Sequence, residues 1–372
     1  MKKIGILGGG QLGRMLIQKG IDWNIDFHVL DPDADAPCRH IAMFKRGKLT
    51  DFETVLEFAK NLDIITIEIE NVSTKALKEL EKLGKSVYPQ ADVIELIQDK
   101  RTQKEFYRRH NIPTSEFVLT NGAEDVKSHA NFLPAVNKLG REGYDGRGVQ
   151  VIRSTADLDK AFNAPGLLEK FVDFEKEISV IVARNVSGEV VSYPPVEMVF
   201  HPEANLVEYL FSPAGIDGRI AHAADAIARS VIEKLKMVGL LAVEMFVTKK
   251  GEVLVNEIAP RPHNSGHQTI EANITSQYEQ HLRAILDLPL GSTKMIKPSA
   301  MVNLLGEDGF SGPARYEGLD EVLAVEGVYV HLYGKKMTKP FRKMGHATIV
   351  DSDIESLRKK ANFVKSTLKV KA

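Results

Sequence analysis

Two glutamates in the second half of the chain are the first residues whose type and spacing indicate chemistry. Glu244 and Glu257 lie in apolar runs at 240–247 and 253–258, which are joined by a turn containing Lys250-Gly251. If that pair forms a two-residue hairpin loop, the two glutamates face each other with side chains about 5 Å apart. Such carboxylates repel unless a cation lies between them, and magnesium held by carboxylates and nucleotide phosphates fits best. The apolar flanks disfavour the alternative of a surface hairpin with solvated acids.

A polar loop follows the second of these strands. Residues 259–269 contain one arginine, two histidines and four further polar residues. Polar density directly after a metal-binding strand suits phosphate groups or an activated intermediate. Arg261 is best placed to neutralise the charge that develops in phosphoryl transfer.

Two glycine-rich loops could bring the backbone close to phosphates. Gly8, Gly10 and Gly13 form G-x-G-x-x-G between a strand at 4–7 and a helix at 14–20, and Asp31 ends the next strand, as in a dinucleotide fingerprint. Any phosphate-bearing ligand would satisfy this loop, and a tight turn without ligand is the alternative. A second loop, with the sequence GREGYDGRG, occupies residues 140–148.

Three structural units must position these residues. Strands and helices alternate over residues 1–98, which predicts a doubly wound parallel sheet. The second unit, 99–174, has a charged helix at 100–110 and short strands at 134–138, 149–153 and 167–171. The third unit, 175–372, has antiparallel strands at 178–183, 190–196, 240–247 and 253–258, interrupted by a long helix at 221–237.

Composition limits the class of protein. A chain of 372 residues suits two or three domains. Its net charge of −1 gives no reason to expect nucleic acid or an anionic membrane as partner. Cys38 is the single cysteine, so no intrachain disulfide forms, and no apolar run approaches the roughly 20 residues of a membrane-spanning helix. Without a signal-peptide pattern, we expect a cytoplasmic enzyme.

Taken together, these segments resemble the ATP-grasp superfamily of ligases and, within it, the 5-(carboxyamino)imidazole ribonucleotide synthase family of purine biosynthesis. Seven segments in the family's order carry the resemblance, although each alone is weak. The resemblance implies an α/β and α+β chain with the ATP-grasp fold: a Rossmann-like domain at 1–98, a small lid domain at 99–174 and a larger antiparallel-sheet domain at 175–372. The matching segments are GGGQLGRM at 8–15, EIENV at 68–72, QDK and QK within 98–104, GYDGRG at 143–148, EKFV at 169–172, NEIAPR and HNSGH within 256–267, and YGK and RKMGH within 333–346.

The resemblance also implies an ATP site. Lys100 and Lys138 would contact the ATP phosphates, and the loop 143–148 would be a mobile lid over them. Backbone groups of 169–172 would line the adenine slot, Glu177 would hold the ribose hydroxyls, and Glu244 and Glu257 would bind Mg²⁺. The implied ATP-binding residues are Lys100, Lys138, Gly143, Tyr144, Asp145, Gly146, Arg147, Gly148, Glu169, Lys170, Phe171, Val172, Glu177, Asn256 and Glu257.

A second substrate, 5-aminoimidazole ribonucleotide, is implied in the same way. Bicarbonate would attack the γ-phosphate of ATP to give carboxyphosphate, which would carboxylate the exocyclic amine. The implied catalytic residues are Lys138, Arg261 and Asp145, the last to remove the amine proton or to orient the amine. The family further implies a homodimer. The implied substrate-binding residues are Gln11, Leu12, Glu70, Tyr144, Asp145, Arg261, Lys335 and Arg342, with Lys335 and Arg342 on the substrate phosphate.

Three other interpretations are weighed against this one. An ATP-grasp relative with another acid or acceptor, such as a formate-using transformylase or a biotin carboxylase, is disfavoured by the segment 264–267 and by the Lys335 and Arg342 pair. An NAD-dependent oxidoreductase built on the first glycine loop leaves the glutamate hairpin and the second glycine loop unexplained. A non-catalytic nucleotide-binding regulator is disfavoured because all the expected charged groups are present.

Overall fold

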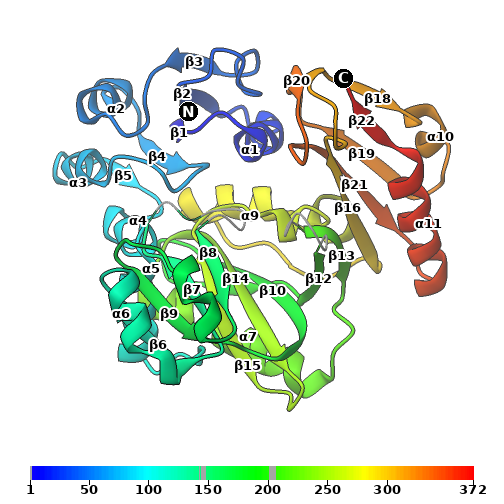
Figure 1. The fold of residues 1–372 in the computed structure, drawn as a ribbon. Coiled ribbons are helices and arrows are strands. Elements are labelled where there is room, and N and C mark those ends of the chain that lie inside the picture. Colours follow the sequence, from blue (N-terminus) through cyan, green and yellow to red (C-terminus); the bar gives the residue numbers. More distant parts are fainter. Residues whose placement is uncertain (1, 142, 144–147, 201–206) are drawn as a thin grey trace.

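A parallel sheet begins the chain. The computed structural model describes residues 2–141, 143, 148–200 and 207–372, and Figure 1 shows their elements. The first sheet has the strand order β3-β2-β1-β4-β5, with every pair parallel, which confirms the Rossmann-like expectation. Its elements are β1 (Lys3–Leu7), α1 (Gln11–Ile21), β2 (Asp26–Asp31), β3 (Met43–Arg46), α2 (Phe52–Ala59), β4 (Ile64–Ile67), α3 (Thr74–Lys82), β5 (Ser86–Val87) and α4 (Ala91–Ile97).

The first helix starts earlier than the sequence predicts. The expected start was Arg14, but α1 begins at Gln11 with Gly10 as its N-cap, and the Arg14 amide donates to the Gly10 carbonyl at 3.0 Å. Gly13 therefore lies inside the helix, where its lack of a side chain lets α1 approach Cys38 and the Gly8 carbonyl closely. The predicted six-residue loop is thus a much shorter turn.

A small antiparallel sheet follows, in the order β6-β9-β7-β8. It corresponds to the predicted lid unit, although the limits at 98/99 and 174/175 remain predictions. Its elements are α5 (Lys100–Arg109), β6 (Phe117–Thr120), α6 (Ala123–Ser128), the 3-10 helix η1 (Ala130–Phe132), β7 (Ala135–Leu139), β8 (Val149–Ile152), η2 (Thr155–Lys160) and β9 (Gly166–Lys170).

The large antiparallel sheet has the order β15-β14-β10-β12-β13-β16-β21-β19, with β11 also paired to β10. The predicted strand at 190–196 is two strands, because Pro194 and Pro195 cannot donate to a ladder. The elements are β10 (Phe174–Arg184), β11 (Val190–Ser192), β12 (Val196–Phe200), β13 (Val207–Ser212), α7 (Gly218–Leu235), β14 (Gly239–Thr248), β15 (Val253–Ala259), η3 (Asn264–Gly266), α8 (Thr269–Ala272), α9 (Gln277–Ile285), β16 (Ser299–Leu305), β17 (Gly312–Pro313), β18 (Arg315–Glu317), α10 (Leu319–Leu323), β19 (Val328–Leu332), β20 (Met337–Thr338), β21 (Lys343–Val350), α11 (Ile354–Thr367) and β22 (Lys369–Lys371).

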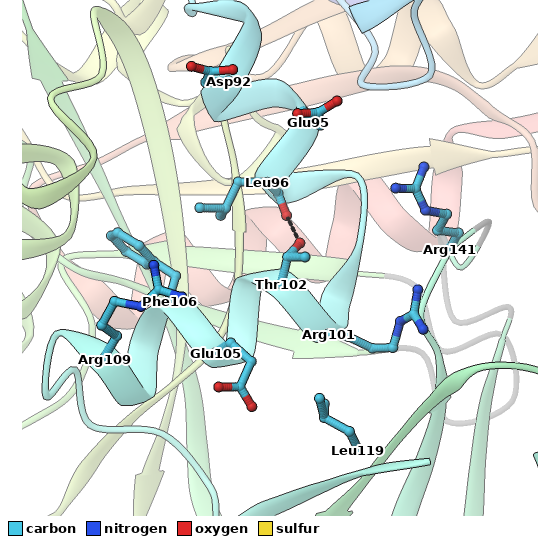
Figure 2. Close-up of a pocket in the computed structure, with 10 residues that line it drawn as sticks. All are labelled: Asp92, Glu95, Leu96, Arg101, Thr102, Glu105, Phe106, Arg109, Leu119 and Arg141. Carbon is cyan, nitrogen blue, oxygen red and sulfur yellow. Dashed lines mark hydrogen bonds between the residues drawn. The ribbon is translucent and has the colours of Figure 1, made fainter. Parts of the chain in front are cut away.

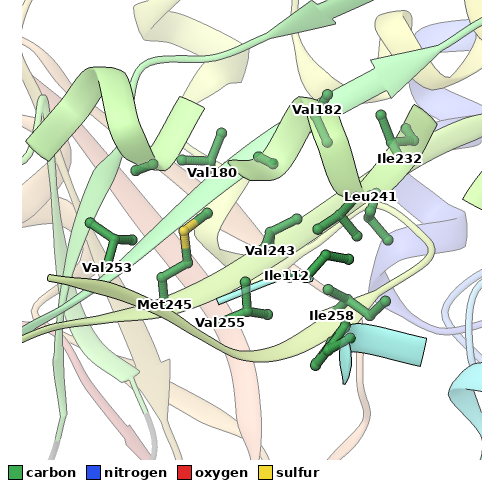
Figure 3. Close-up of a cluster of buried hydrophobic side chains, with 14 of the residues drawn as sticks. Ile112, Val180, Val182, Ile232, Leu241, Val243, Met245, Val253, Val255 and Ile258 are labelled. Atoms are coloured by element: carbon green, nitrogen blue, oxygen red, sulfur yellow. The ribbon is translucent and has the colours of Figure 1, made fainter. Parts of the chain in front are cut away.

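The main core fills the space between α7 and one face of β10, β14 and β15. Figure 3 shows Ile232 of α7 in one cluster with Val180 and Val182 of β10 and Val243 of β14, all with essentially no exposed surface. Apolar alternation along β14 directs Val243, Met245 and Val247 into this core and leaves the intervening side chains on the opposite face. Glu244 is one of those intervening residues, so the core fixes the direction in which it points.

Helix α9 connects the N-terminal sheet to the large sheet, and Figure 1 shows it between them. Its Tyr278, Leu282 and Ile285 share a core with Ile4 and Ile6 of β1. His281 on the same helix is fully buried, and its Nε2 lies 2.9 Å from Thr66 Oγ1 on β4. Among the described residues, no helix combines the length and the apolar character needed to cross a bilayer.

Burial of His281 predicts that the fold loses stability in mild acid. Burial lowers its pKa to about 4. In the unfolded chain the pKa of this histidine is about 6.5. Between pH 6.5 and 4 the unfolded state therefore binds more protons than the folded state. The free energy of unfolding falls as the pH drops through this range, and His281 contributes about 3 kcal/mol to the loss. We expect His281→Gln to flatten the dependence of melting temperature on pH between 6.5 and 4. The exposed His222→Gln on α7 is the matched control, and equal slopes for wild type and His281→Gln would contradict the prediction.

Candidate active site

The two predicted metal-binding glutamates face each other across the β14–β15 hairpin. Glu244 pairs directly with Glu257, which confirms the predicted juxtaposition. The turn differs from the predicted one: Gly251 donates its amide to the Thr248 carbonyl at 2.8 Å and has φ 78°, so residues 249–251 form a three-residue loop. That loop alone would place Glu244 opposite Asn256.

A β-bulge at Asn256 restores the pairing. Met245 pairs with Val255 and Glu244 with Glu257, so Asn256 is the extra residue on β15. The bulge also reverses the alternation of the strand: Val253, Val255 and Ile258 face the core, whereas Asn256 and Glu257 both lie on the other face. Two consecutive polar side chains are thereby presented to the same site.

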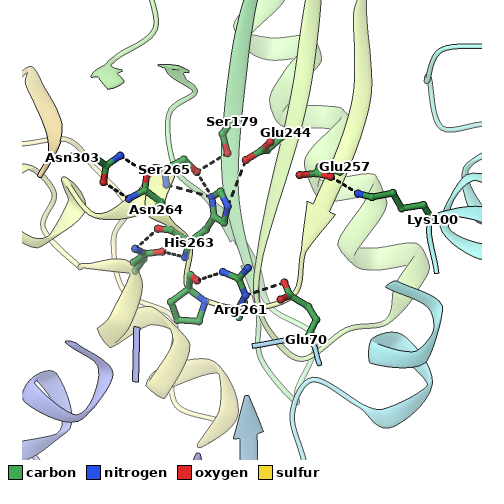
Figure 4. A network of polar contacts seen from close by, with 12 residues as sticks. Glu70, Lys100, Ser179, Glu244, Glu257, Arg261, His263, Asn264, Ser265 and Asn303 are labelled. Atoms are coloured by element: carbon green, nitrogen blue, oxygen red, sulfur yellow. Dashed lines mark hydrogen bonds and ion pairs between the residues drawn. The ribbon is translucent and has the colours of Figure 1, made fainter. Parts of the chain in front are cut away.

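Lysines from the lid unit meet this face of the hairpin. Lys100 Nζ, at the first residue of α5, lies 2.6 Å from Glu257 Oε2 (Figure 4). Lys138 Nζ of β7 donates to Asn256 Oδ1 at 2.9 Å and lies 3.1 Å from Glu169 Oε2 of β9. Five of the predicted ATP-site residues, from four elements, are therefore in direct contact.

His263 lies on the other side of Glu244, and sequence reasoning assigned it no role. Its Nε2 lies 3.5 Å from Glu244 Oε1, and its Nδ1 contacts Ser265 Oγ, which in turn contacts Ser179 Oγ of β10. Burial, with the charges of Arg261 and Lys343, lowers the pKa of His263 to about 3, so the imidazole that contacts the Glu244 carboxyl group is neutral. The polar loop indicated His263, whereas Ser179 in an apolar strand gave no signal.

Electrostatics at the hairpin fit a divalent cation. Burial and the negative charge of Glu257 raise the pKa of Glu244, and burial with Glu257 raises the pKa of Glu177 to about 7. The charge of Lys100 instead lowers the pKa of Glu257. Within the described part of the chain, no group of three or more His, Cys, Asp or Glu side chains is arranged to hold a metal ion. Magnesium is commonly bound by one or two carboxylates together with substrate phosphates, and Glu244 and Glu257 offer two carboxylates.

Four of the predicted second-substrate residues lie in two separate places. Arg261 Nε lies 2.9 Å from Glu70 Oε1, so these two residues meet beside the hairpin (Figure 4). Lys335 donates to the Lys343 carbonyl at 2.7 Å, and Arg342 to the Met337 carbonyl at 2.6 Å, so both are held in the β20–β21 region. Their role on a substrate phosphate remains a prediction.

The first glycine loop binds a carboxylate of the chain itself. Glu68, directly after β4, accepts hydrogen bonds from the amides of Gly10 at 2.6 Å and Leu12 at 3.1 Å, and Asp31 accepts one from Gly9 at 2.7 Å. A Cβ on Gly10 would lie 2.2 Å from Glu68 Oε1. The glycines therefore admit an internal anion, which removes the dinucleotide interpretation of this motif. Gln11 is the first residue of α1, beside these amides.

The remaining predicted ATP residues lie at the edge of the lid sheet. Lys170 donates to the Phe132 and Leu133 carbonyls at 3.1 and 3.4 Å, and the Phe171 amide donates to the Pro134 carbonyl, so the side chain of Lys170 is committed to the lid. Val172 is half-buried. Gly143 and Gly148 flank the second glycine loop, and the predicted residues Tyr144, Asp145, Gly146 and Arg147 lie outside the described residues.

A cavity of 710 Å³ lies apart from this site, between α4, α5 and β6 (Figure 2). Its lining combines three arginines with three acidic residues around Leu96, Phe106 and Leu119. None of the predicted site residues lines it, so the candidate site is defined by the polar contacts above rather than by this cavity.

Three protein families match successive parts of the chain. The ribonucleotide synthetase preATP-grasp domain matches residues 1–98, the ATP-grasp domain 105–278, and the phosphoribosylaminoimidazole carboxylase C-terminal domain 299–360. With the antiparallel sheets and the lysine–carboxylate site, these matches define an ATP-grasp enzyme, as the sequence predicts.

Individual relatives narrow the class. An N5-carboxyaminoimidazole ribonucleotide synthase of Synechococcus elongatus is 40% identical over 94% of this chain and 89% of its own length. The chloroplastic phosphoribosylaminoimidazole carboxylase of Vigna aconitifolia is 38% identical over 95% of this chain, which spans only 65% of that longer protein.

Solved structures similar to this chain point to the same family. The N5-carboxyaminoimidazole ribonucleotide synthetase of Thermotoga maritima has a TM-score of 0.92 and 44% identity, with both chains fully covered. The N5-carboxyaminoimidazole synthase of Aspergillus clavatus, solved with ADP and 5-aminoimidazole ribonucleotide, has a TM-score of 0.90 and 32% identity over 98% of each chain. The chain belongs to the N5-carboxyaminoimidazole ribonucleotide synthase family of ATP-grasp ligases, which acts in purine biosynthesis.

The glycine-loop geometry predicts a loss of stability in Gly10→Ala. The Glu68 carboxylate can make room for the new methyl group only by giving up hydrogen bonds to the loop amides, which costs about 2 kcal/mol. We expect a lower melting temperature in calorimetry. Gly218→Ala is the control, because a Cβ there meets nothing within 4 Å. An unchanged melting temperature in Gly10→Ala would show that the loop does not hold Glu68 in this way.

Proposed function

We propose that this chain carboxylates 5-aminoimidazole ribonucleotide with bicarbonate, using Mg²⁺ and ATP and releasing ADP and phosphate. The observation that carries the proposal is the meeting of Glu244 and Glu257 with Lys100 and Lys138, beside the Glu70–Arg261 pair. The Aspergillus clavatus relative, whose solved complex contains ADP and 5-aminoimidazole ribonucleotide, supports the choice of nucleotide substrates.

The nucleotide half of the reaction uses the lysine–carboxylate contacts. Glu244 and Glu257 would hold Mg²⁺, which would supply positive charge for the phosphates of ATP. Lys100, now in contact with Glu257, would donate to a phosphate oxygen. Lys138, held by Asn256, would stabilise the charge on the transferred group.

The acceptor half of the reaction takes place beside Arg261. An oxygen of bicarbonate attacks the γ-phosphorus, the bond from that phosphorus to ADP breaks, and carboxyphosphate forms. Carboxyphosphate then delivers its carbon to the exocyclic amine, and phosphate leaves. Arg261, fixed by Glu70 at 2.9 Å, would neutralise charge on the transferred groups, while Lys335 and Arg342 would bind the substrate phosphate. Asp145 stays the candidate for receiving the amine proton.

The proposal includes the assembly and its location. The family resemblance supports a homodimer, and the charge balance and residue composition support a cytoplasmic enzyme. Light scattering coupled to size-exclusion chromatography measures the first directly.

The hairpin assignment predicts that Glu257→Gln loses activity and keeps its fold. Removing one metal-binding carboxylate should lower the rate of ADP release roughly 100-fold, because phosphoryl transfer depends on charge stabilisation. Glu252→Gln, in the exposed turn of the same hairpin, should keep the wild-type rate. Circular dichroism verifies folding. A Glu257→Gln enzyme as active as Glu252→Gln would remove Glu257 from the metal site.

The substrate assignment predicts coupled ADP release. With Mg·ATP and bicarbonate present, we expect ADP release to rise at least tenfold when 5-aminoimidazole ribonucleotide is added, because the acceptor captures the activated carbon. Omission of bicarbonate is the control, and formate tests the alternative acid. If formate supports ADP release and bicarbonate does not, the proposed reaction is overturned, while the ATP-grasp site stays in place.

A further inference from the structure

Behind Lys138 lies a second, fully buried lysine that the proposed reaction does not use. Lys104 of α5 is 2% exposed and Glu169 is 3% exposed. Lys104 Nζ lies 3.1 Å from Glu169 Oε1, and Lys138 Nζ lies 3.1 Å from Glu169 Oε2. Each oxygen of one carboxylate therefore faces a different ammonium group, and Lys138 also donates to Asn256 in the metal hairpin.

Among the carboxylates that the structure describes, Lys104 forms its ion pair with Glu169. It also donates to Thr114 Oγ1 at 2.5 Å and to Ser115 Oγ at 3.3 Å, both neutral, and Ser115 Oγ donates to Glu169 Oε2 at 3.1 Å. Lys104 lies one helical turn after Lys100, so one face of α5 delivers Lys100 to Glu257 and Lys104 to Glu169. Lys104 thus lies behind the site rather than in it.

Both members of the pair are charged at neutral pH. Burial alone would raise the pKa of Glu169, but the charges of Lys138 and Lys104 outweigh it and lower this pKa to about 2. Burial lowers the pKa of Lys104 to about 8, against the attraction of Glu169, which leaves the ammonium form predominant at pH 7. Without Lys104, the whole negative charge of Glu169 would act on Lys138.

We propose that Lys104 is a positioning residue that compensates the buried charge of Glu169, so that the ammonium group of Lys138 keeps its positive charge available for the nucleotide phosphates. The inference rests on the proposed ATP site. In a site of low polarity, a carboxylate next to a phosphate-binding lysine weakens anion binding, and a second cation on its far side cancels that effect. Lys104 would do so from a buried position behind Lys138.

The test compares ATP affinity in three variants by calorimetric titration with Mg·ATP. Lys104→Met, which has a similar volume and no charge, should bind ATP at least tenfold more weakly than wild type. Lys104→Met combined with Glu169→Gln removes the uncompensated carboxylate as well, and should bind at least threefold more tightly than Lys104→Met alone. Arg109→Met removes a positive charge from the exposed end of the same helix, and should bind as wild type does.

If Lys104 has only a structural role, removing Glu169 as well should not restore ATP affinity. If the double variant binds ATP no more tightly than Lys104→Met, charge compensation is overturned.

Steady-state assays of Lys104→Met give a second readout. The KM for ATP should rise, whereas the KM for the second substrate should not, because Lys104 has no contact with Glu70 or Arg261. If Lys104→Met does not fold, Lys104→Gln, whose amide can bond to Thr114 and Ser115, replaces it. Failure of the wild type itself to bind Mg·ATP would reject the proposed function, a result distinct from these.

Discussion

The facing carboxylates of Glu244 and Glu257 impose a condition that the surrounding structure must meet. Two acids held opposite each other by a strand pair cannot both ionise in a half-buried site without nearby positive charge. Lys100 supplies positive charge on one side and keeps Glu257 ionised. On the other side Glu244 faces the neutral imidazole of His263, and burial with the charge of Glu257 raises the pKa of Glu244. What remains is a site in which a cation is electrostatically favoured and already has two oxygen donors.

The residues of this site come from all three parts of the chain. Lys100 and Lys138 belong to the small antiparallel unit, Glu70 follows the fourth strand of the parallel sheet, and the hairpin belongs to the large sheet. Helix α9 packs the parallel sheet against the large one, and its buried contacts keep Glu70 beside Arg261. Chemistry at the hairpin therefore depends on packing between units as much as on the residues that line it.

The sequence predicts the sheets and the facing of Glu244 and Glu257 because these depend on local patterns, whereas the other site residues are expected from the family resemblance. Alternating strands and helices predict the parallel sheet, and apolar runs on either side of a turn predict the hairpin. The facing of Glu244 and Glu257 is right although the turn is wrong, since the longer loop and the bulge at Asn256 offset each other. The unequal spacing of Val253, Val255 and Ile258 was the available signal for that bulge.

Other features could not be predicted because they depend on contacts between distant segments. Nothing local in the glycine loop indicates that its amides would bind Glu68, which follows β4, the strand paired directly with β1. Likewise Ser179 and Lys104 lie in unremarkable helical and strand patterns, and only the assembled fold brings them to Ser265 and Glu169. Roles at Tyr144 and Asp145 rest on family resemblance alone.

The bulge has a consequence for how this hairpin can vary among related chains. Because Asn256 is the one residue of β15 without a partner on β14, its loss would close the ladder and still leave Glu244 opposite Glu257. Lys138 would lose its hydrogen bond to Asn256 Oδ1, while the carboxylates of Glu244 and Glu257 would stay in register. Deletion of Asn256 therefore removes one interaction selectively. An insertion or deletion of one residue elsewhere between the turn and either glutamate would instead shift the register and turn a glutamate toward the core.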